Sequence, residues 1–190
     1  EFVVRDAGTY WYHPHHNSSA QVGWGLYGPI VVEDPSDSPA FGDDLVLMLS
    51  DMTLDEAGQL LPKDNGGSFG DLFGREGSVL LVNGKVRPRP KVRAGKPQRW
   101  RVINAARARY YSMSLRGFTR LGGDNGLAER SQKLARLLVV PGERLDVSYT
   151  PSFAPGTVSA LRWLPVDRGY STAFGRQSET MMEIETVNES

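Results

Sequence analysis

GTYWYHPH at residues 8–15 and GLYGPIVV at residues 25–32 predict a pair of β-strands near the start of the chain. Aromatic and β-branched residues favour strands, and the glycines beside them mark turns. Side chains two positions apart on a strand point to the same face. Trp11, His13 and His15 are therefore expected to share one face. Neutral imidazoles are common ligands of copper and zinc, so this pair is a candidate metal site.

A His-x-His sequence on a strand is often only two partly exposed histidines. The neighbouring residues favour a metal site here, because the histidines continue a face that already carries the large side chain of Trp11. A histidine at the end of a buried aromatic row is held in place rather than free in solvent.

The composition excludes several classes of protein. The chain has 190 residues, 39% of them hydrophobic, and a formal net charge of zero, so neither nucleic acid nor an anionic membrane is expected as a partner. No apolar run is long enough for a transmembrane helix. The chain has no cysteine, which excludes disulfides, iron–sulfur ligation and a blue-copper centre built from its own residues. The segment EFVVR at residues 1–5 is typical of a strand and has neither an initiator methionine nor a signal segment. We therefore expect a segment of a longer protein.

Short β-rich runs between Gly, Pro, Asp and Asn predict an all-β fold with few helices. Many evenly spaced strands favour a β-sandwich. Asp55–Gly77 is expected to be a long loop, and the sequence VNGK at residues 82–85 a hairpin turn. The predicted strands are Phe2–Arg5, Thr9–His15, Tyr27–Glu33, Leu45–Ser50, Val79–Val82, Gln98–Asn104, Tyr110–Leu115, Leu134–Val140, Arg144–Tyr149, Thr157–Leu164 and Thr180–Thr186.

The predicted organisation is one complete domain preceded by the end of another. Residues 1–34 hold too few strands to bury a core alone, residues 35–42 form a polar, proline-containing linker, and residues 43–190 suffice for a whole sandwich. The first segment should therefore expose strand edges and apolar side chains. Such surfaces favour self-association, aggregation or mobility of that segment.

Charged residues elsewhere have a structural interpretation. The acid-free segment 85–109 combines many Lys and Arg with aromatic residues, but the alternation from Arg87 to Arg93 is typical of a solvated strand face rather than a single-stranded nucleic-acid platform. Asp124, Glu143 and Asp146 lack a partner base or nucleophile at a recognisable spacing, so we interpret them as turn caps and ion pairs. No residue is predicted to be catalytic.

Six motifs, in the same order, resemble the multicopper oxidases, a family that includes laccases. GTYWYHPH with GLYGPIVV resembles the end of their first cupredoxin domain, and DLVL at residues 44–47 the opening of the second. LVNGK at 81–85, RWRVINA at 99–105, GDNGL at 123–127 and VPGERLD at 140–146 resemble the middle of that second domain. The resemblance covers nearly the whole chain and implies a cupredoxin-like Greek-key sandwich.

The resemblance also implies a metal. Four His-x-His-type motifs hold a trinuclear copper cluster in this family, and His13-Pro14-His15 matches the second of them. His13 would then ligate one copper of the type 3 pair and His15 the other, whereas His16 matches no ligand. Residues about 7 Å apart on one face of a strand can each reach a different metal ion. The second domain would be copper-free.

The other histidine motifs and the blue-copper ligands of the family are absent from this chain. The resemblance therefore implies a parent that oxidises a reducing small molecule or metal ion by single electrons and reduces dioxygen to water, in the periplasm or outside the cell. The isolated chain is expected to be inactive.

Two other classes of function stay open from the residues alone. A mononuclear His-x-His metal enzyme of the cupin type needs a third ligand, and the chain has no other histidine than His13, His15 and His16. A carboxylate would have to replace it. A non-enzymatic β-sandwich with a basic binding surface would show salt-dependent binding of polyanions.

Overall fold

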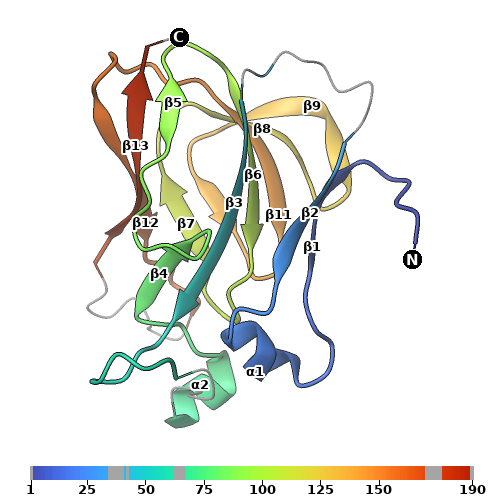
Figure 1. Cartoon of the computed structure of the whole chain (residues 1–190), viewed down its shortest axis with the longest axis vertical. Coiled ribbons are helices and arrows are strands. Elements are labelled where there is room, and N and C mark those ends of the chain that lie inside the picture. The colour runs from blue at the N-terminus through green and yellow to red at the C-terminus, as the bar shows by residue number, and fades with distance from the viewer. Residues whose placement is uncertain (1, 34–40, 42, 62–66, 170–176, 189–190) are drawn as a thin grey trace.

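The protein is almost entirely β-structure in the computed structural model, which describes residues 2–33, 41, 43–61, 67–169 and 177–188 (Figure 1). Two short helices are present in these ranges, α1 (Ser18–Gly23) and α2 (Gly67–Phe73). The strands are β1 (Gly8–Tyr12), β2 (Gly28–Val32), β3 (Asp43–Met52), β4 (Val79–Val82), β5 (Lys91–Arg93), β6 (Gln98–Asn104), β7 (Tyr111–Ser114), β8 (Phe118–Gly123), β9 (Gly126–Leu134), β10 (Leu137–Val139), β11 (Arg144–Tyr149), β12 (Val158–Leu164) and β13 (Glu179–Val187).

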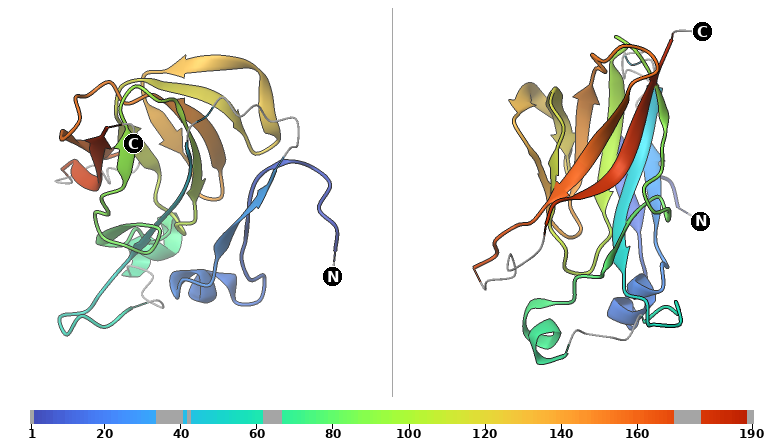
Figure 2. Two further views of the ribbon diagram at one scale, coloured as in Figure 1. Left: turned by 45° about the horizontal axis from the view of Figure 1, so that its top comes forward. Right: turned by 90° about the vertical axis from the view of Figure 1, so that its left-hand side faces the viewer.

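The strands form two larger sheets and one separate pair. One sheet has the order β4-β3-β6-β11-β8-β9, the other β10-β7-β12-β13-β5, and β1 pairs only with β2. Most neighbours are antiparallel, while β3 with β6 and β13 with β5 are parallel. The two larger sheets face each other as a sandwich (Figure 2). This architecture confirms the predicted all-β sandwich.

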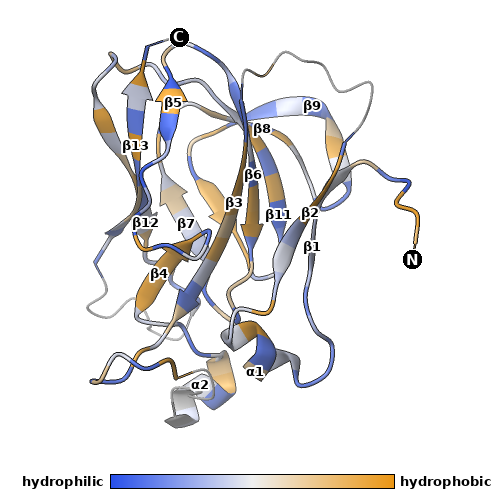
Figure 3. Cartoon of the chain, in the orientation of Figure 1, coloured by the Kyte–Doolittle hydropathy of each residue, from blue (hydrophilic) through white to orange (hydrophobic). Residues whose placement is uncertain are grey.

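The main core lies between the two larger sheets. Trp100 and Val102 of β6 pack there with Tyr149 of β11 and Trp163 of β12. The rings of Trp100 and Tyr149 lie 4.9 Å apart between centroids, close enough for a favourable aromatic contact. Hydrophobic residues run along β3, β4 and β6, whereas much of β9 is hydrophilic and exposed (Figure 3).

A second, smaller core lies on the opposite face of the six-stranded sheet. Met48, Ile103 and Ala105 form it, and Trp11 and Tyr27 pack against them. The antiparallel pair β1–β2 therefore covers this outer face, on the side away from the five-stranded sheet (Figure 1). Every residue of β6 is buried, because both of its faces are covered.

The predicted strand Phe2–Arg5 is wrong: these residues form no strand and are exposed. The stretch Asp55–Gly77 is not only a loop, since α2 lies in it. The VNGK turn is confirmed, with Val82 bridged to Lys85 and with positive φ at Asn83 and Gly84, the conformation of a tight hairpin.

The proposed domain boundaries stay predictions. The linker predicted at 35–42 lies outside the described residues except for Phe41. Among the described residues, no helix has the length and hydrophobicity needed to cross a membrane.

Candidate metal centre

His13 and His15 lie just beyond the end of β1, in the segment that leads to α1. The strand ends at Tyr12, so the prediction that it extends to His15 is wrong. His13 is half-buried, and His15 and His16 are exposed. Asn17, which follows them, has a positive φ of 47° and begins the turn into α1.

The two imidazoles nevertheless lie on the same side of the chain as Trp11. The Trp11 and His13 rings are stacked, with centroids 4.4 Å apart and an interplanar angle of 26°. The His13 and His15 rings are stacked in turn, with centroids 4.7 Å apart and an angle of 25°. The predicted common face of Trp11, His13 and His15 is thus present although the regular strand has ended.

The backbone limits which nitrogen of His13 is free for a metal. Its Nδ1 lies 3.2 Å from the carbonyl oxygen of Pro14. An Nδ1–H group that donates to this oxygen leaves Nε2 with the lone pair that a metal ion would use.

A complete metal site needs more donors than these two. In the described part of the chain, no group of three or more His, Cys, Asp and Glu side chains is placed to hold a metal ion. The donor chemistry of the imidazole pair suits copper, but it supplies only part of a coordination shell.

The strand that precedes the histidines is fastened to the six-stranded sheet by a buried polar network. The Thr9 hydroxyl donates to Asp146 Oδ1 at 2.7 Å and accepts from Arg101 Nη1 at 3.1 Å. Asp146 Oδ2 pairs with Arg99 Nη2 at 2.6 Å, and Arg101 Nε donates to Asp44 at 2.8 Å. Thr9, Arg99, Arg101 and Asp146 are all buried. The contacts that join β1 to the six-stranded sheet are therefore shielded from water.

The basic segment is surface only in part. Arg87, Arg89 and Lys91 are exposed, as predicted. Arg99, Arg101 and Arg109 of the same segment are buried, so the predicted solvated strand face does not extend over all of it. Each is paired with a carboxylate, because an unpaired buried charge is costly: Arg109 Nε donates to Asp51 at 2.8 Å, and the other two pair with Asp146 and Asp44.

The carboxylates interpreted as structural have that role. Asp124 accepts a hydrogen bond from the Arg144 backbone N–H at 2.8 Å, and Glu143 accepts one from the Val140 N–H at 2.7 Å. Asp146 is the buried centre of the network around Thr9.

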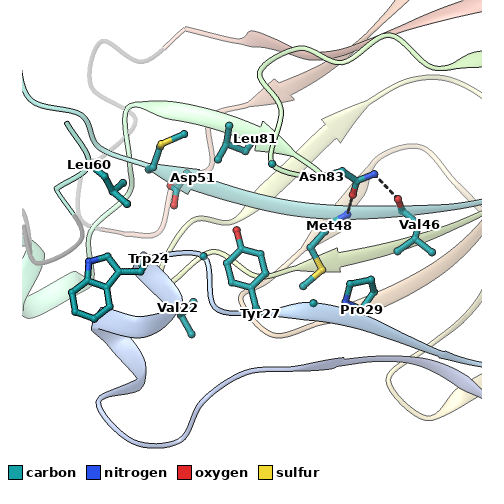
Figure 4. Close-up of a pocket in the computed structure, with 15 residues that line it drawn as sticks. Val22, Trp24, Tyr27, Pro29, Val46, Met48, Asp51, Leu60, Leu81 and Asn83 are labelled. Atoms are coloured by element: carbon teal, nitrogen blue, oxygen red, sulfur yellow. Dashed lines mark hydrogen bonds between the residues drawn. The ribbon is translucent and has the colours of Figure 1, made fainter. Parts of the chain in front are cut away.

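A pocket of about 620 Å³ lies between the α1–β2 segment and β3–β4 (Figure 4). Trp24 and Tyr27 line one wall, and Met48, Asp51 and Asn83 the other. Burial raises the pKa of the Tyr27 hydroxyl, and the nearby Asp51 carboxylate adds to the rise. Sequence analysis missed this pocket, since its walls come from segments that no motif connects.

Fold and site together define a β-sandwich protein of the cupredoxin type with a histidine pair beside it. Residues 1–37 match the family model described as multicopper oxidase. The laccase of Bacillus subtilis (strain 168) is 34% identical over 153 residues, covering 72% of this chain and 30% of that protein. The cell division protein FtsP of Sodalis glossinidius is 33% identical over 158 residues, covering 76% of this chain and 32% of that protein.

The crystal structure of the McoA multicopper oxidase from Aquifex aeolicus has 29% sequence identity and a TM-score of 0.82. The match covers 99% of this chain and 43% of that one. The chain therefore belongs to the multicopper oxidase family and corresponds to one part of such a protein, since it spans about a third of the length of the curated relatives that it matches.

Proposed function

We propose that this chain is the part of a copper-dependent oxidase that supplies His13 and His15 to a trinuclear copper cluster. The observation that carries the proposal is the stacked pair of imidazoles, held on the same side of the chain. The parent would take single electrons from a reducing small molecule or metal ion and reduce dioxygen to water. Its location in the periplasm or outside the cell is part of the same proposal.

The ring geometry favours one metal ion per histidine. An imidazole nitrogen offers its lone pair in the plane of its ring. Two rings stacked at 4.7 Å with an angle of 25° hold their lone pairs in two separate, nearly parallel planes. His13 and His15 would therefore each present a ring nitrogen to a different copper ion, which would supply one-electron redox chemistry.

The residues of this chain would bind copper and orient its ligands. The sandwich anchors the histidine-bearing segment through Thr9, Asp146 and Arg101. With two imidazoles alone, each ion lacks most of its ligands, so the chain by itself should hold copper weakly and should not reduce dioxygen.

A role in cell division is the second candidate, because the FtsP proteins, named for cell division, are nearly as similar to this chain as the laccase is. The histidine pair favours the first candidate, because a copper cluster needs imidazole nitrogens as ligands. The mononuclear alternative has less support, since no third donor joins the pair within the described residues.

The test uses the full-length protein that contains this chain. His13→Ala and His15→Ala should each abolish dioxygen uptake and lower the copper content, while His16→Ala, at an adjacent exposed histidine, should change neither. Dioxygen reduction at the wild-type rate by the double His13→Ala, His15→Ala variant would overturn the proposal. Copper-dependent oxidase activity of the present chain alone would overturn it as well, because a complete site would then exist here.

A further inference from the structure

Trp11 lies between the body of the protein and the first of the two histidines. Its side chain packs against the cluster of Met48, Ile103 and Ala105 on the outer face of the six-stranded sheet. Its ring also stacks on His13 at 4.4 Å. Contacts thus run without a break from the sheet to Trp11, from Trp11 to His13, and from His13 to His15.

We propose that Trp11 is a positioning residue for the metal-binding pair: it sets the plane of the His13 ring, and through that ring the plane of His15. This inference rests on the proposed function of the two histidines. The reason for it is that His13 lies beyond the end of β1. Hydrogen bonds of the strand ladder therefore no longer fix its backbone, and a ring contact takes over that role.

Trp11 can serve as a reference only if it is itself fixed. Its backbone is paired with Pro29 of β2. Two residues before it, on the same face, Thr9 is held by Asp146 and Arg101, and Arg144 Nε donates to the Thr9 carbonyl oxygen at 3.3 Å. β1 is therefore held to the six-stranded sheet by Asp146, Arg101 and Arg144. The position of Trp11 is thus fixed relative to that sheet.

A side chain that only fills space would need bulk but no aromatic face. Trp11→Leu keeps an apolar side chain at this position and removes the stacking surface, whereas Trp11→Phe keeps a ring. Trp24→Leu is the matched control, because Trp24 is also near the histidines in sequence but is 46% exposed and lines the pocket instead.

Nuclear magnetic resonance of the imidazoles measures the stack directly, since the chain has only three histidines. In the wild-type chain, the indole ring current should shift the His13 ring protons upfield of those of the exposed His16. Trp11→Leu should remove most of this shift, Trp11→Phe should retain a larger part of it, and Trp24→Leu should leave it unchanged. Equal His13 and His16 shifts in the wild-type chain would overturn the proposal without any variant.

Titration of the full-length protein that contains this chain with copper(II) ions alone gives the second readout. Trp11→Leu should weaken binding about tenfold, the lower end of the effect of removing a group that orients a metal ligand, and Trp11→Phe should restore most of the affinity. His13→Ala separates the two proposals. If His13→Ala leaves copper affinity unchanged, the proposed function of the pair is wrong. If His13→Ala loses affinity but Trp11→Leu does not, the positioning role alone is wrong.

Discussion

The Thr9 hydroxyl donates a 2.7 Å hydrogen bond to the carboxylate of Asp146, which lies 137 positions later in the chain. Both side chains are buried. This bond joins the strand that leads to the histidine pair with the centre of the six-stranded sheet, where Asp146 also pairs with Arg99. The position of the candidate metal ligands thus depends on residues that have no contact with a metal.

Asp146→Asn should destabilise the fold strongly, because it removes the carboxylate charge that pairs with the buried Arg99 guanidinium. Removing one partner of a buried ion pair typically costs about 3–5 kcal/mol. Urea unfolding measures the loss of free energy. Glu183→Gln, at the partly exposed pair with Arg89, is the control and should cost about 1 kcal/mol or less. Equal losses in the two variants would contradict the structural role of Asp146.

Thr9→Val should loosen the β1–β2 pair more than the rest of the protein. It removes the hydroxyl and leaves Asp146 Oδ1 without this donor, an effect of about 1–3 kcal/mol. Hydrogen exchange should become faster at the β1 and β2 amides, while β11 stays protected. Thr9→Ser keeps the hydroxyl and should behave nearly as wild type; faster exchange in both variants alike would point to packing of the Thr9 methyl group instead.

Stability should fall at alkaline pH, above about 10. Burial, with a contribution from Asp51, raises the pKa of Tyr111 well above its usual value of 10.0, and burial also raises the pKa of Tyr149. The folded state therefore keeps protons that the unfolded state releases, so the stabilisation is complete below pH 10 and is lost as the pH rises further.

Ultraviolet absorbance of the tyrosinate, followed together with circular dichroism, tests this pH dependence. Tyr111, whose hydroxyl donates to the Ser50 carbonyl oxygen, should ionise only as the protein unfolds. Tyr111→Phe should make the loss of stability above pH 10 shallower. Ionisation of every tyrosine near pH 10 without unfolding would disagree with the burial of Tyr111.

The isolated chain should self-associate through its first segment. Phe2 and Val3 are about four-fifths exposed, and Tyr12 and Leu26 are at least half exposed. Exposed apolar side chains beside a sheet of only two strands favour association. Sedimentation should show a concentration-dependent mass, and the double variant Phe2→Ser, Val3→Ser should reduce it. A wild-type chain that stays monomeric at all concentrations would refute this prediction.

Several strands could be predicted from the sequence at their observed bounds. Val79–Val82, Gln98–Asn104 and Arg144–Tyr149 are β-favouring runs flanked by turn residues, so local preference and final structure agree. The strands β5, β8 and β9 were missed. β5 has only three residues, and β9 is polar from Glu129 to Lys133, so neither carries the hydrophobic alternation on which the prediction depends.

For the candidate site, too, some features could be predicted from the sequence and others depend on the tertiary structure. His13 and His15 are recognisable from the motif alone, and so is their common side of the chain, because alternation is a local property. The stacking of His13 on Trp11, and the packing of Trp11 on Met48 and Ile103, are not. They depend on which face of a distant sheet the first strand pair covers.

The sequence by itself determined the all-β class, the positions of most strands, the histidine pair and the family, since each follows from residues close together in the chain. Only the tertiary structure decided that Arg99 and Arg101 are buried. The alternation of Arg99, Trp100, Arg101 and Val102 is that of a strand with one solvated face. Here that face is covered by β1 and β2, and Asp146, Asp44 and Thr9 neutralise or bond the arginines. A period of two residues shows that a strand has two faces, but not what lies against each of them.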